Sequence, residues 1–209
     1  MTPPTRTKTR RLSRAEKREA NRERILRAAR TVFGARGFQA ATIEQIADEA
    51  GLSNGAIYYN FDSKAELFFE LLEERQDERI QHLRRTLTGT DASGRDVGLA
   101  EEARDATRSL KESREWRLLL FEFVAHAARS PSLRPKLRAY TRRLRDAVAG
   151  VFDERFAARG VAMPMPREQL ALAAIALANG LAFEELSDPG VVPDELLGDL
   201  LATLLEPKQ

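Results

Sequence analysis

The sequence predicts an all-α fold in which a small N-terminal unit of three helices precedes a larger helical bundle. Apolar residues recur every three or four positions through most of the 209 residues, and no segment alternates apolar and polar residues as a half-buried strand would. Gly, Pro, Ser and Thr interrupt these stretches at positions where helices start and stop. We therefore expect helices joined by turns and loops.

The first predicted helix covers about residues 13–36. Gly37 follows it at the position of a left-handed residue that ends a helix, and Phe38 would then lie against Phe33. We expect this helix to hold the next two at a fixed angle. Its apolar face consists of Ile25, Ala28, Ala29, Val32 and Phe33.

Two short helices are predicted within residues 42–64, and their arrangement is that of a helix-turn-helix. Thr42 and Gln45 form a capping box at the start of the first, and Gly51 ends it in a left-handed conformation. Ser53 caps the second. The buried stripe of the pair consists of Ile43, Ile46, Ala47, Ala50, Ile57 and Phe61.

The second short helix leaves a polar and aromatic surface free. A helix that enters a DNA major groove presents its N-terminal residues to the bases, and Gly55 and Ala56 would let the backbone approach closely. Amide and hydroxyl groups suit base edges and phosphates. Lys64 opens the next helix, where the helix dipole disfavours a cation, and a shared DNA phosphate would remove that conflict. The candidate DNA-binding residues are Thr42, Ser53, Asn54, Gly55, Ala56, Tyr58, Tyr59, Asn60 and Lys64.

This segment resembles the signature of the TetR family of bacterial transcription regulators. The resemblance covers roughly the first third of the chain, and the remainder matches only in its helical character. It implies a homodimeric, sequence-specific repressor of a palindromic DNA operator that a small effector releases. The matching residues are Thr42, Ile46, Ala47, Ala50, Gly51, Ser53, Gly55, Tyr58, Phe61, Ser63, Lys64 and Leu67.

Charge is distributed unevenly, although the formal net charge is only +2. Residues 1–64 contain 13 basic and 7 acidic residues, so the remainder is net acidic. A basic N-terminal unit suits phosphate binding, and chance clustering of surface charge is the alternative. Arg10 and Arg11 belong to a basic arm over residues 1–11, which would either contact DNA or act as a solubilising tail.

Composition argues against several classes of site. With no Cys and only two His, the sequence offers no disulfides, no thiolate nucleophile and few metal ligands. No acidic pair forms a recognisable catalytic constellation. We expect no enzymatic activity, no cofactor and no metal. No signal-peptide pattern is present, and the apolar stretch 170–183 is short for a bilayer span, so we expect a bacterial cytoplasmic protein that joins the nucleoid when DNA-bound.

The rest of the chain is predicted to be helical, with a long helix reaching about residue 87 and a loop over 88–98. Further helices are expected over residues 99–110, 113–130, 132–160, 167–186 and 194–205. The helix over 113–130, apolar on most sides, is expected to be central. The last two carry apolar stripes that a second copy would bury as a four-helix bundle, and completion of the monomer core is the alternative. The candidate dimer residues are Leu170, Ala174, Leu177, Ala178, Leu181, Leu197, Leu200, Leu201 and Leu204.

An effector site is expected between the central helices, and a close-packed core without a pocket is the alternative. Because few charged residues are expected inside, we predict a small apolar or aromatic effector. Glu122, His126 and Arg129 share one helix face and would supply polar groups. The candidate lining residues are Trp116, Phe121, Phe123, His126, Tyr140, Phe152 and Phe156.

These expectations give three segments. Residues 1–19 form a flexible basic arm and helix start, residues 20–66 the helix-turn-helix DNA-binding domain, and residues 67–209 the ligand-binding and dimerisation domain. The expected partners are double-stranded DNA, a second copy of the chain and the effector. The alternative function is that of an architectural DNA-binding protein with little sequence specificity, or of a regulator without an effector.

Overall fold

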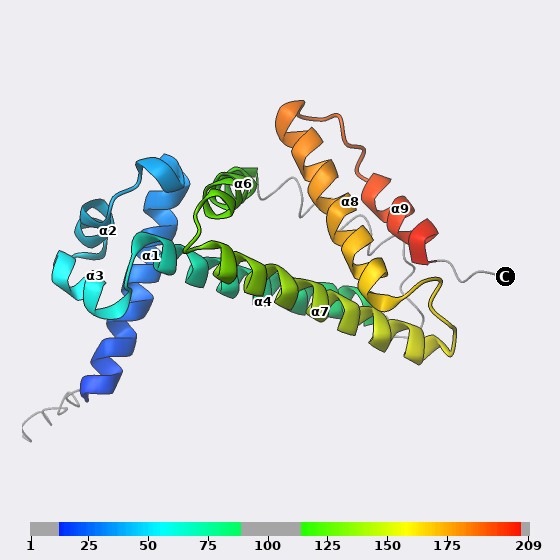
Figure 1. The fold of residues 1–209 in the computed structure, drawn as a ribbon, viewed down its shortest axis with the longest axis horizontal. Helices are drawn as coiled ribbons and strands as arrows, with labels where there is room; N and C mark the ends of the chain where they lie inside the picture. The colour runs from blue at the N-terminus through cyan, green and yellow to red at the C-terminus, as the bar shows by residue number, and fades with distance from the viewer. Residues whose placement is uncertain (1–12, 89–113, 206–209) are drawn as a thin grey trace, which may run out of the picture. The chain divides into compact units, whose positions relative to one another are not determined.

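The computed structural model describes residues 13–88 and 114–205, without the side chains of residues 82 and 85–88. Within these ranges the chain forms eight helices and no strand (Figure 1), so the predicted all-α fold is confirmed. It divides into two compact units, Met1–Leu71 and Leu72–Gln209, here called unit 1 and unit 2. The division falls inside helix α4 (Lys64–Thr88). The expected basic arm with Arg10 and Arg11, the loop after residue 88 and the helix over 99–110 lie outside the described residues.

Unit 1 contains three helices and the first turns of α4. Helix α1 spans Arg14–Ala40, α2 spans Ile43–Ala50 and α3 spans Asn54–Asn60. Helix α1 packs against both α2 and α3, as its expected scaffold role requires. The apolar stripe predicted for the two short helices is buried, and Ile46 and Ile57 are completely inaccessible.

Three phenylalanines form the aromatic centre of unit 1. The rings of Phe33 and Phe38 stack with centroids 5.8 Å apart, which confirms the predicted contact, and Phe68 of α4 meets them edge-on at 5.1 and 5.3 Å. Gly37 makes this possible by kinking α1 with φ 77° and ψ 170°, a region open essentially to glycine. The helix does not end at Gly37 as predicted, because a further helical turn follows the kink.

The turn from α2 to α3 follows its local sequence signals. The Thr42 amide donates to Gln45 Oε1 at 3.1 Å, and the Gln45 amide donates to Thr42 Oγ1 at 3.3 Å, which completes the capping box. Gly51 is left-handed, with φ 62° and ψ 40°. Ser53 Oγ accepts from the Ala56 amide at 3.3 Å, so α3 begins as expected.

Unit 2 contains the rest of α4 and, among the described residues, four further helices. They are α6 (Arg114–Arg129), α7 (Arg134–Arg159), α8 (Arg167–Ser187) and α9 (Leu196–Leu205). Helix α7 packs on α8, α6 contacts both, and α9 packs on α8. The larger apolar cluster of this unit is built mainly from α7 and α8, and residues of α4 and α9 pack against it.

Helix α6 is not the central buried helix that its composition indicated. Its buried residues are Leu119, Phe123, Ala127 and a charged one, Arg117, whereas Leu118 is 47% exposed. The apolar residues around α6 therefore divide between the core and the surface.

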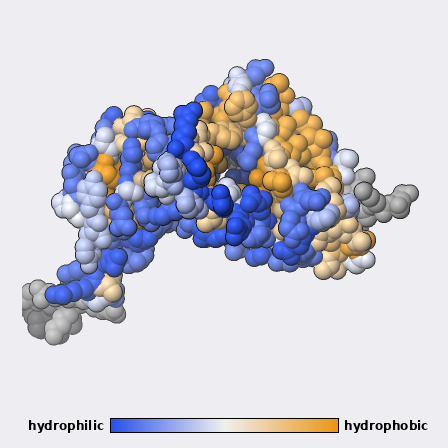
Figure 2. Space-filling model, in the orientation of Figure 1, coloured by the Kyte–Doolittle hydropathy of each residue, from blue (hydrophilic) through white to orange (hydrophobic). Residues whose placement is uncertain are grey.

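Helix α8 has an apolar surface of its own. Among the described helices it is the one whose length and composition would permit it to cross a membrane, but helices packed in a protein core or interface have the same composition. Leu172 and Phe183 are 53% and 59% exposed. Figure 2 shows hydrophobic residues gathered over α8 and α9.

Candidate nucleic-acid interface and effector cavity

The outer surface of α3 carries two exposed tyrosines beside small and amide side chains. Tyr58 is 54% exposed and Tyr59 is 72% exposed, and Asn54 and Gly55 are also exposed. Ile57 on the inner side is completely buried. A seven-residue helix that keeps two tyrosines in water presents hydroxyl groups and flat rings to a partner, because folding alone would favour covering them.

The charge around this surface favours an anion. Helix α3 contains no acidic residue, and the guanidinium carbon of Arg18 on α1 lies 5.4 Å from the centre of the Tyr59 ring. Tyr59 is therefore held by a cation that is itself within reach of the same surface. Phosphate oxygens accept hydrogen bonds from Arg and Tyr alike.

Several predicted contact residues already have hydrogen-bonding partners within unit 1. The side chains of Thr42 and Ser53 act as helix caps, and Thr42 also hydrogen-bonds the Glu44 carboxylate. A hydrogen bond from its own amide, followed by the one from Thr42, lowers the pKa of Glu44. Asn60 Nδ2 donates to the Ala56 carbonyl at 2.7 Å, and Ala56 is half-buried. Of the α3 residues, Asn54, Tyr58 and Tyr59 present the most accessible polar groups.

Lys64 has a partner other than the phosphate predicted from the sequence. Its ammonium donates to the carbonyls of Phe38, Gln39 and Ala41 at 2.8, 3.1 and 2.7 Å, and lies 4.7 Å from the centre of the Phe38 ring. These carbonyls are at the C-terminal end of α1, where the helix dipole favours a cation. The conflict at the start of α4 is thus relieved inside the protein, where Lys64 caps α1, and the phosphate contact expected of Lys64 stays a prediction.

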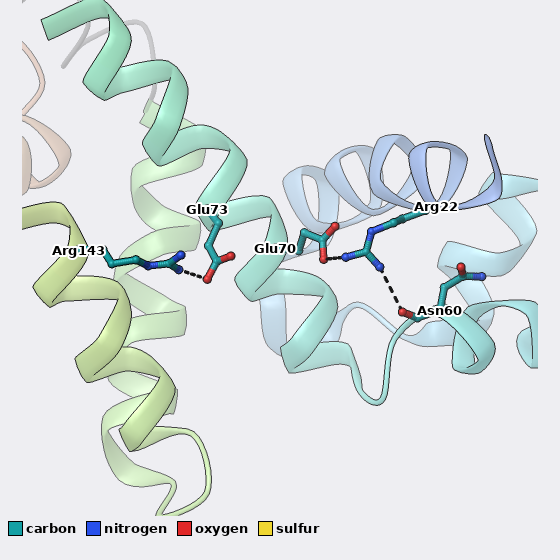
Figure 3. Close-up of polar contacts among 5 residues, drawn as sticks. All are labelled: Arg22, Asn60, Glu70, Glu73 and Arg143. Atoms are coloured by element: carbon teal, nitrogen blue, oxygen red, sulfur yellow. Dashed lines mark hydrogen bonds and ion pairs between the residues drawn. The ribbon is translucent and has the colours of Figure 1, made fainter. Parts of the chain in front are cut away.

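Cations from another helix also cap the C-terminal ends of α2 and α3. Arg24 donates to the carbonyl of Ala50 at 2.7 Å, at the end of α2, and Arg22 donates to the carbonyl of Asn60 at 3.4 Å, at the end of α3. Arg22 also pairs with Glu70 of α4 (Figure 3). Each of the first three helices is therefore capped by a cation from another helix. Sequence reasoning missed these caps because the partners are 23–38 residues apart.

Unit 2 contains a partly open cavity of about 600 Å³ lined by residues of α4, α6, α7, α8 and α9. Of the predicted lining residues, Phe121, Tyr140 and Phe152 border it. Phe123 and Phe156 are instead packed in the core, with exposures of 0% and 5%. Trp116 and His126 also lie outside the cavity wall. These four residues are corrected from lining to surrounding positions, because side chains on one helix point in several directions.

Trp116 packs behind one of the lining residues. Its ring centre is 5.8 Å from the guanidinium carbon of Arg75. Arg75 also lies 3.7 Å from the Glu78 carboxylate on the same helix. Trp116 therefore helps to position an arginine of the cavity rather than contacting its contents.

The cavity wall contains four arginines, which the sequence did not lead us to expect. Arg75 and Arg79 come from successive turns of α4, Arg117 from α6 and Arg145 from α7, whereas Glu78 is the acidic residue among the described residues that line it. Arg117 is 4% exposed. Burial, with repulsion from Arg79 and Arg75, lowers its pKa to about 10.

Arg79 and Tyr140 share the same environment. Burial lowers the pKa of Arg79 and raises that of Tyr140, and the two side chains interact electrostatically. Arg79 is surrounded by protein atoms and yet exposed to solvent, because it borders the cavity, so burial acts more strongly on Arg117 than on Arg79. The part of the cavity wall that contains these arginines is therefore positive.

The predicted dimer residues divide into buried and half-buried groups. Leu170, Ala174 and Leu197 are 0%, 8% and 3% exposed within one chain, which corrects their assignment to an interface. Leu200 is 38% exposed and remains accessible. The half-buried residues, which pack against the clusters of unit 2, are Leu177, Ala178, Leu181, Leu201 and Leu204.

Comparison with known proteins covers both units. The family model described as "Bacterial regulatory proteins, tetR family" matches residues 25–71, and the one described as "BetI-type transcriptional repressor, C-terminal" matches residues 105–207. The HTH-type transcriptional activator FasR of Mycolicibacterium smegmatis is 36% identical over 86 residues, which are 41% of this chain and 39% of FasR. The match thus spans less than half the length of that relative.

Solved structures extend the likeness over most of the chain. GusR of Salmonella enterica has a TM-score of 0.69 at 23% identity, covering 89% of this chain and 95% of GusR. The multidrug binding protein EbrR, solved in complex with ethidium, has a TM-score of 0.62 at 21% identity, covering 88% of this chain and 97% of EbrR. At these identities the structures show the fold alone. The two family models show that this chain belongs to the TetR family of helix-turn-helix transcriptional regulators.

Proposed function

We propose that this regulator is a homodimeric repressor that binds a palindromic operator and is released by a small molecule bound in unit 2. Residues 1–19 would be a basic arm and helix start, residues 20–66 the DNA-binding domain, and residues 67–209 the ligand-binding and dimerisation domain. It would act in the bacterial cytoplasm and join the nucleoid when bound to DNA.

The observation that carries the DNA-binding part is the exposed, acid-free surface of α3. Asn54 and Gly55 are in its first turn, where a recognition helix meets base edges. Tyr58 and Tyr59, which are exposed, would donate hydrogen bonds to phosphate oxygens. The caps from Lys64, Arg24 and Arg22 tie the C-terminal ends of α1, α2 and α3 to other helices, which would hold the surface in place before DNA binds.

Dimerisation is supported by the exposed apolar stripe of α8. Leu172, Ala176, Gly180 and Phe183 are all exposed and recur at three- to four-residue spacing, and Leu200 of α9 is also exposed. Leu172 and Ala176 also border the cavity, so Gly180, Phe183 and Leu200 are the members of the stripe that lie outside it. This stripe differs from the one proposed from sequence, whose best-buried members face the protein's own core. A second copy packed on it would form a four-helix bundle, and a dimer that reads a palindrome needs its two recognition helices about 34–36 Å apart, one turn of duplex.

An effector role is supported by the cavity of about 600 Å³, which lies in the range of small-molecule sites. Its walls come from five helices, so a ligand that fits one arrangement of those helices better than another would shift the equilibrium between them. EbrR, which has the same fold, was solved with ethidium. The sequence predicted an apolar or aromatic effector, and the apolar side chains of the cavity wall would pack against such a molecule.

The experiment is a binding assay with a palindromic duplex from the region upstream of the gene and a random duplex of equal length, at one fixed salt concentration. Specific regulators bind their sites roughly 10³–10⁷-fold more tightly than random DNA. A ratio near one would contradict the proposal and favour the architectural DNA-binding alternative.

Two variants divide the α3 surface by role. Asn54→Ala should change the preferred base at one position of each half-site, whereas Tyr58→Phe should weaken binding to every duplex to a similar extent, because it removes one hydroxyl. The control is Arg27→Met, whose guanidinium is 65% exposed and pairs with Glu23 on α1. If Asn54→Ala lowers affinity equally for every sequence, Asn54 does not read bases.

A further inference from the structure

Three of the four arginines that line the cavity, Arg75, Arg79 and Arg117, are grouped together. Arg117 on α6 interacts electrostatically with Arg75 and Arg79 on α4, and Arg79 interacts with Tyr140 on α7. These contacts place three guanidinium groups and a phenol near one another. Four arginines and one glutamate among the described lining residues give the cavity a net positive charge.

Another part of the cavity wall is formed by apolar side chains. Leu83 of α4, Leu144 of α7 and Leu201 of α9 pack against a cluster that contains Val148 and Phe152, and all five border the cavity. Along α7, the twelve steps from Tyr140 to Phe152 correspond to roughly 18 Å. The lining residues therefore include a charged group near Tyr140 and an apolar group near Phe152, with Arg145 between them on α7.

The charged and the apolar groups of lining residues together favour one class of ligand. Guanidinium groups hold carboxylates and phosphates through paired, charge-assisted hydrogen bonds, and these bonds strengthen where water is scarce. The buried Arg117 is repelled by Arg75 and Arg79, and this repulsion is relieved when an anion enters, whereas a cation would add to it. Burial of a hydrocarbon chain against the apolar side chains makes a favourable contribution to the binding free energy.

We propose that the cavity binds an amphiphilic organic anion, with its carboxylate or phosphate on Arg75, Arg79 and Arg117 and its hydrocarbon chain against Val148, Phe152 and Leu201. This inference rests on the proposed effector role of unit 2 and specifies the charge of the effector. It revises the expectation of a purely apolar or aromatic ligand, which assumed that few charges face the interior.

The test uses the full chain without DNA and three probes with the same twelve-carbon tail. Laurate is the anion, dodecanol its neutral counterpart and dodecyltrimethylammonium its cationic counterpart, each below its micelle concentration. Binding is measured by calorimetry and by the fluorescence of Trp116, the single tryptophan. We expect laurate to bind at least tenfold more tightly than dodecanol, and the cation to bind more weakly than both.

Variants then locate the charge preference. Arg117→Met and Arg79→Met should each lower laurate affinity at least tenfold and leave dodecanol affinity unchanged. Arg142→Met, at an exposed position of α7 that does not line the cavity, is the matched control and should leave both unchanged. Equal affinity for laurate and dodecanol, tighter binding of the cation, or equal loss in the control would each overturn the proposal.

A separate measurement distinguishes this proposal from the proposed function. If laurate binds in an arginine-dependent way but does not release the operator, the ligand class stands and the effector role fails. If the protein binds its operator specifically but the cavity prefers the neutral or cationic probe, the regulatory function stands and the ligand class fails.

Discussion

Replacing Lys64 with methionine separates the two explanations of this residue, as a cap for α1 or as an anchor for phosphate. Methionine keeps the length and apolar stem of the side chain, so its packing beside Phe38 is retained. What is lost is the ammonium that donates to three carbonyls at 2.7–3.1 Å. The substitution therefore tests the hydrogen bonds and the charge with little change in volume.

The expected cost follows from the partners. A hydrogen bond from a charged donor contributes about 1.5–3 kcal/mol, and an orphaned buried carbonyl carries a further penalty. The carbonyls of Phe38 and Ala41 are partly buried, whereas that of Gln39 is exposed and can be hydrated. We expect Lys64→Met to destabilise the protein by about 2–3 kcal/mol, and the Tm of the transition that includes unit 1 to fall by about 5–10 °C.

The assay is denaturant unfolding followed by circular dichroism, with Arg27→Met as the control. Arg27 is exposed and makes a single 3.7 Å pair with Glu23, so its loss should cost less than about 0.5 kcal/mol. DNA binding is then measured at several salt concentrations below the transition. An unchanged unfolding midpoint, together with a salt dependence reduced by about one phosphate contact, would refute the cap and restore the phosphate anchor.

Three other substitutions test separate parts of the structure. Gly51→Ala should cost about 1–2 kcal/mol, because φ is 62° and the new Cβ would lie 3.3 Å from Arg24, whereas Gly55→Ala in the helical α3 should gain about 0.5–1 kcal/mol in the same unfolding assay. Arg117→Met should stabilise the ligand-free protein by about 1–3 kcal/mol at neutral pH, since a pKa lowered to about 10 means that the charged form is disfavoured in the fold. Wild-type stability should correspondingly rise as the pH increases above about 10, where the unfolded chain binds more protons, and a variant less stable than wild type at pH 7 would show that the charge is well compensated. Phe183→Glu should convert a dimer into a monomer in light scattering, whereas Val161→Glu, also at an exposed apolar position, should not, and loss of the dimer in both would argue against the α8 stripe.

The helix-turn-helix could be predicted closely because its signals are local. The capping box of Thr42 and Gln45 joins residues three apart, and Gly51 adopts its left-handed conformation within a single turn. Periodicity likewise identified Ile46 and Ile57 as buried, because a short amphipathic helix has one apolar side. These features depend on neighbours within about one helical turn, which are fixed by the order of residues.

The apolar helices of unit 2 were less predictable. In α8, Leu170 is buried and Leu172 is exposed, although both belong to a helix that is apolar on several sides. Composition gives such a helix no preferred direction, so the choice between core and interface is made by the helices that pack against it. The same reason explains why Phe121 borders the cavity while Phe123 is enclosed in the core.

By itself, then, the sequence determined the fold class, the capped helices and the exposed α3 surface of a TetR-family regulator. The tertiary structure alone decided what the charged residues do. Lys64 meets carbonyls 23–26 positions earlier in the chain, and Arg117 meets Arg75 and Arg79 from another helix. The energy of a charge depends on every group around it in space, and long-range proximity is not encoded in any local pattern of residues.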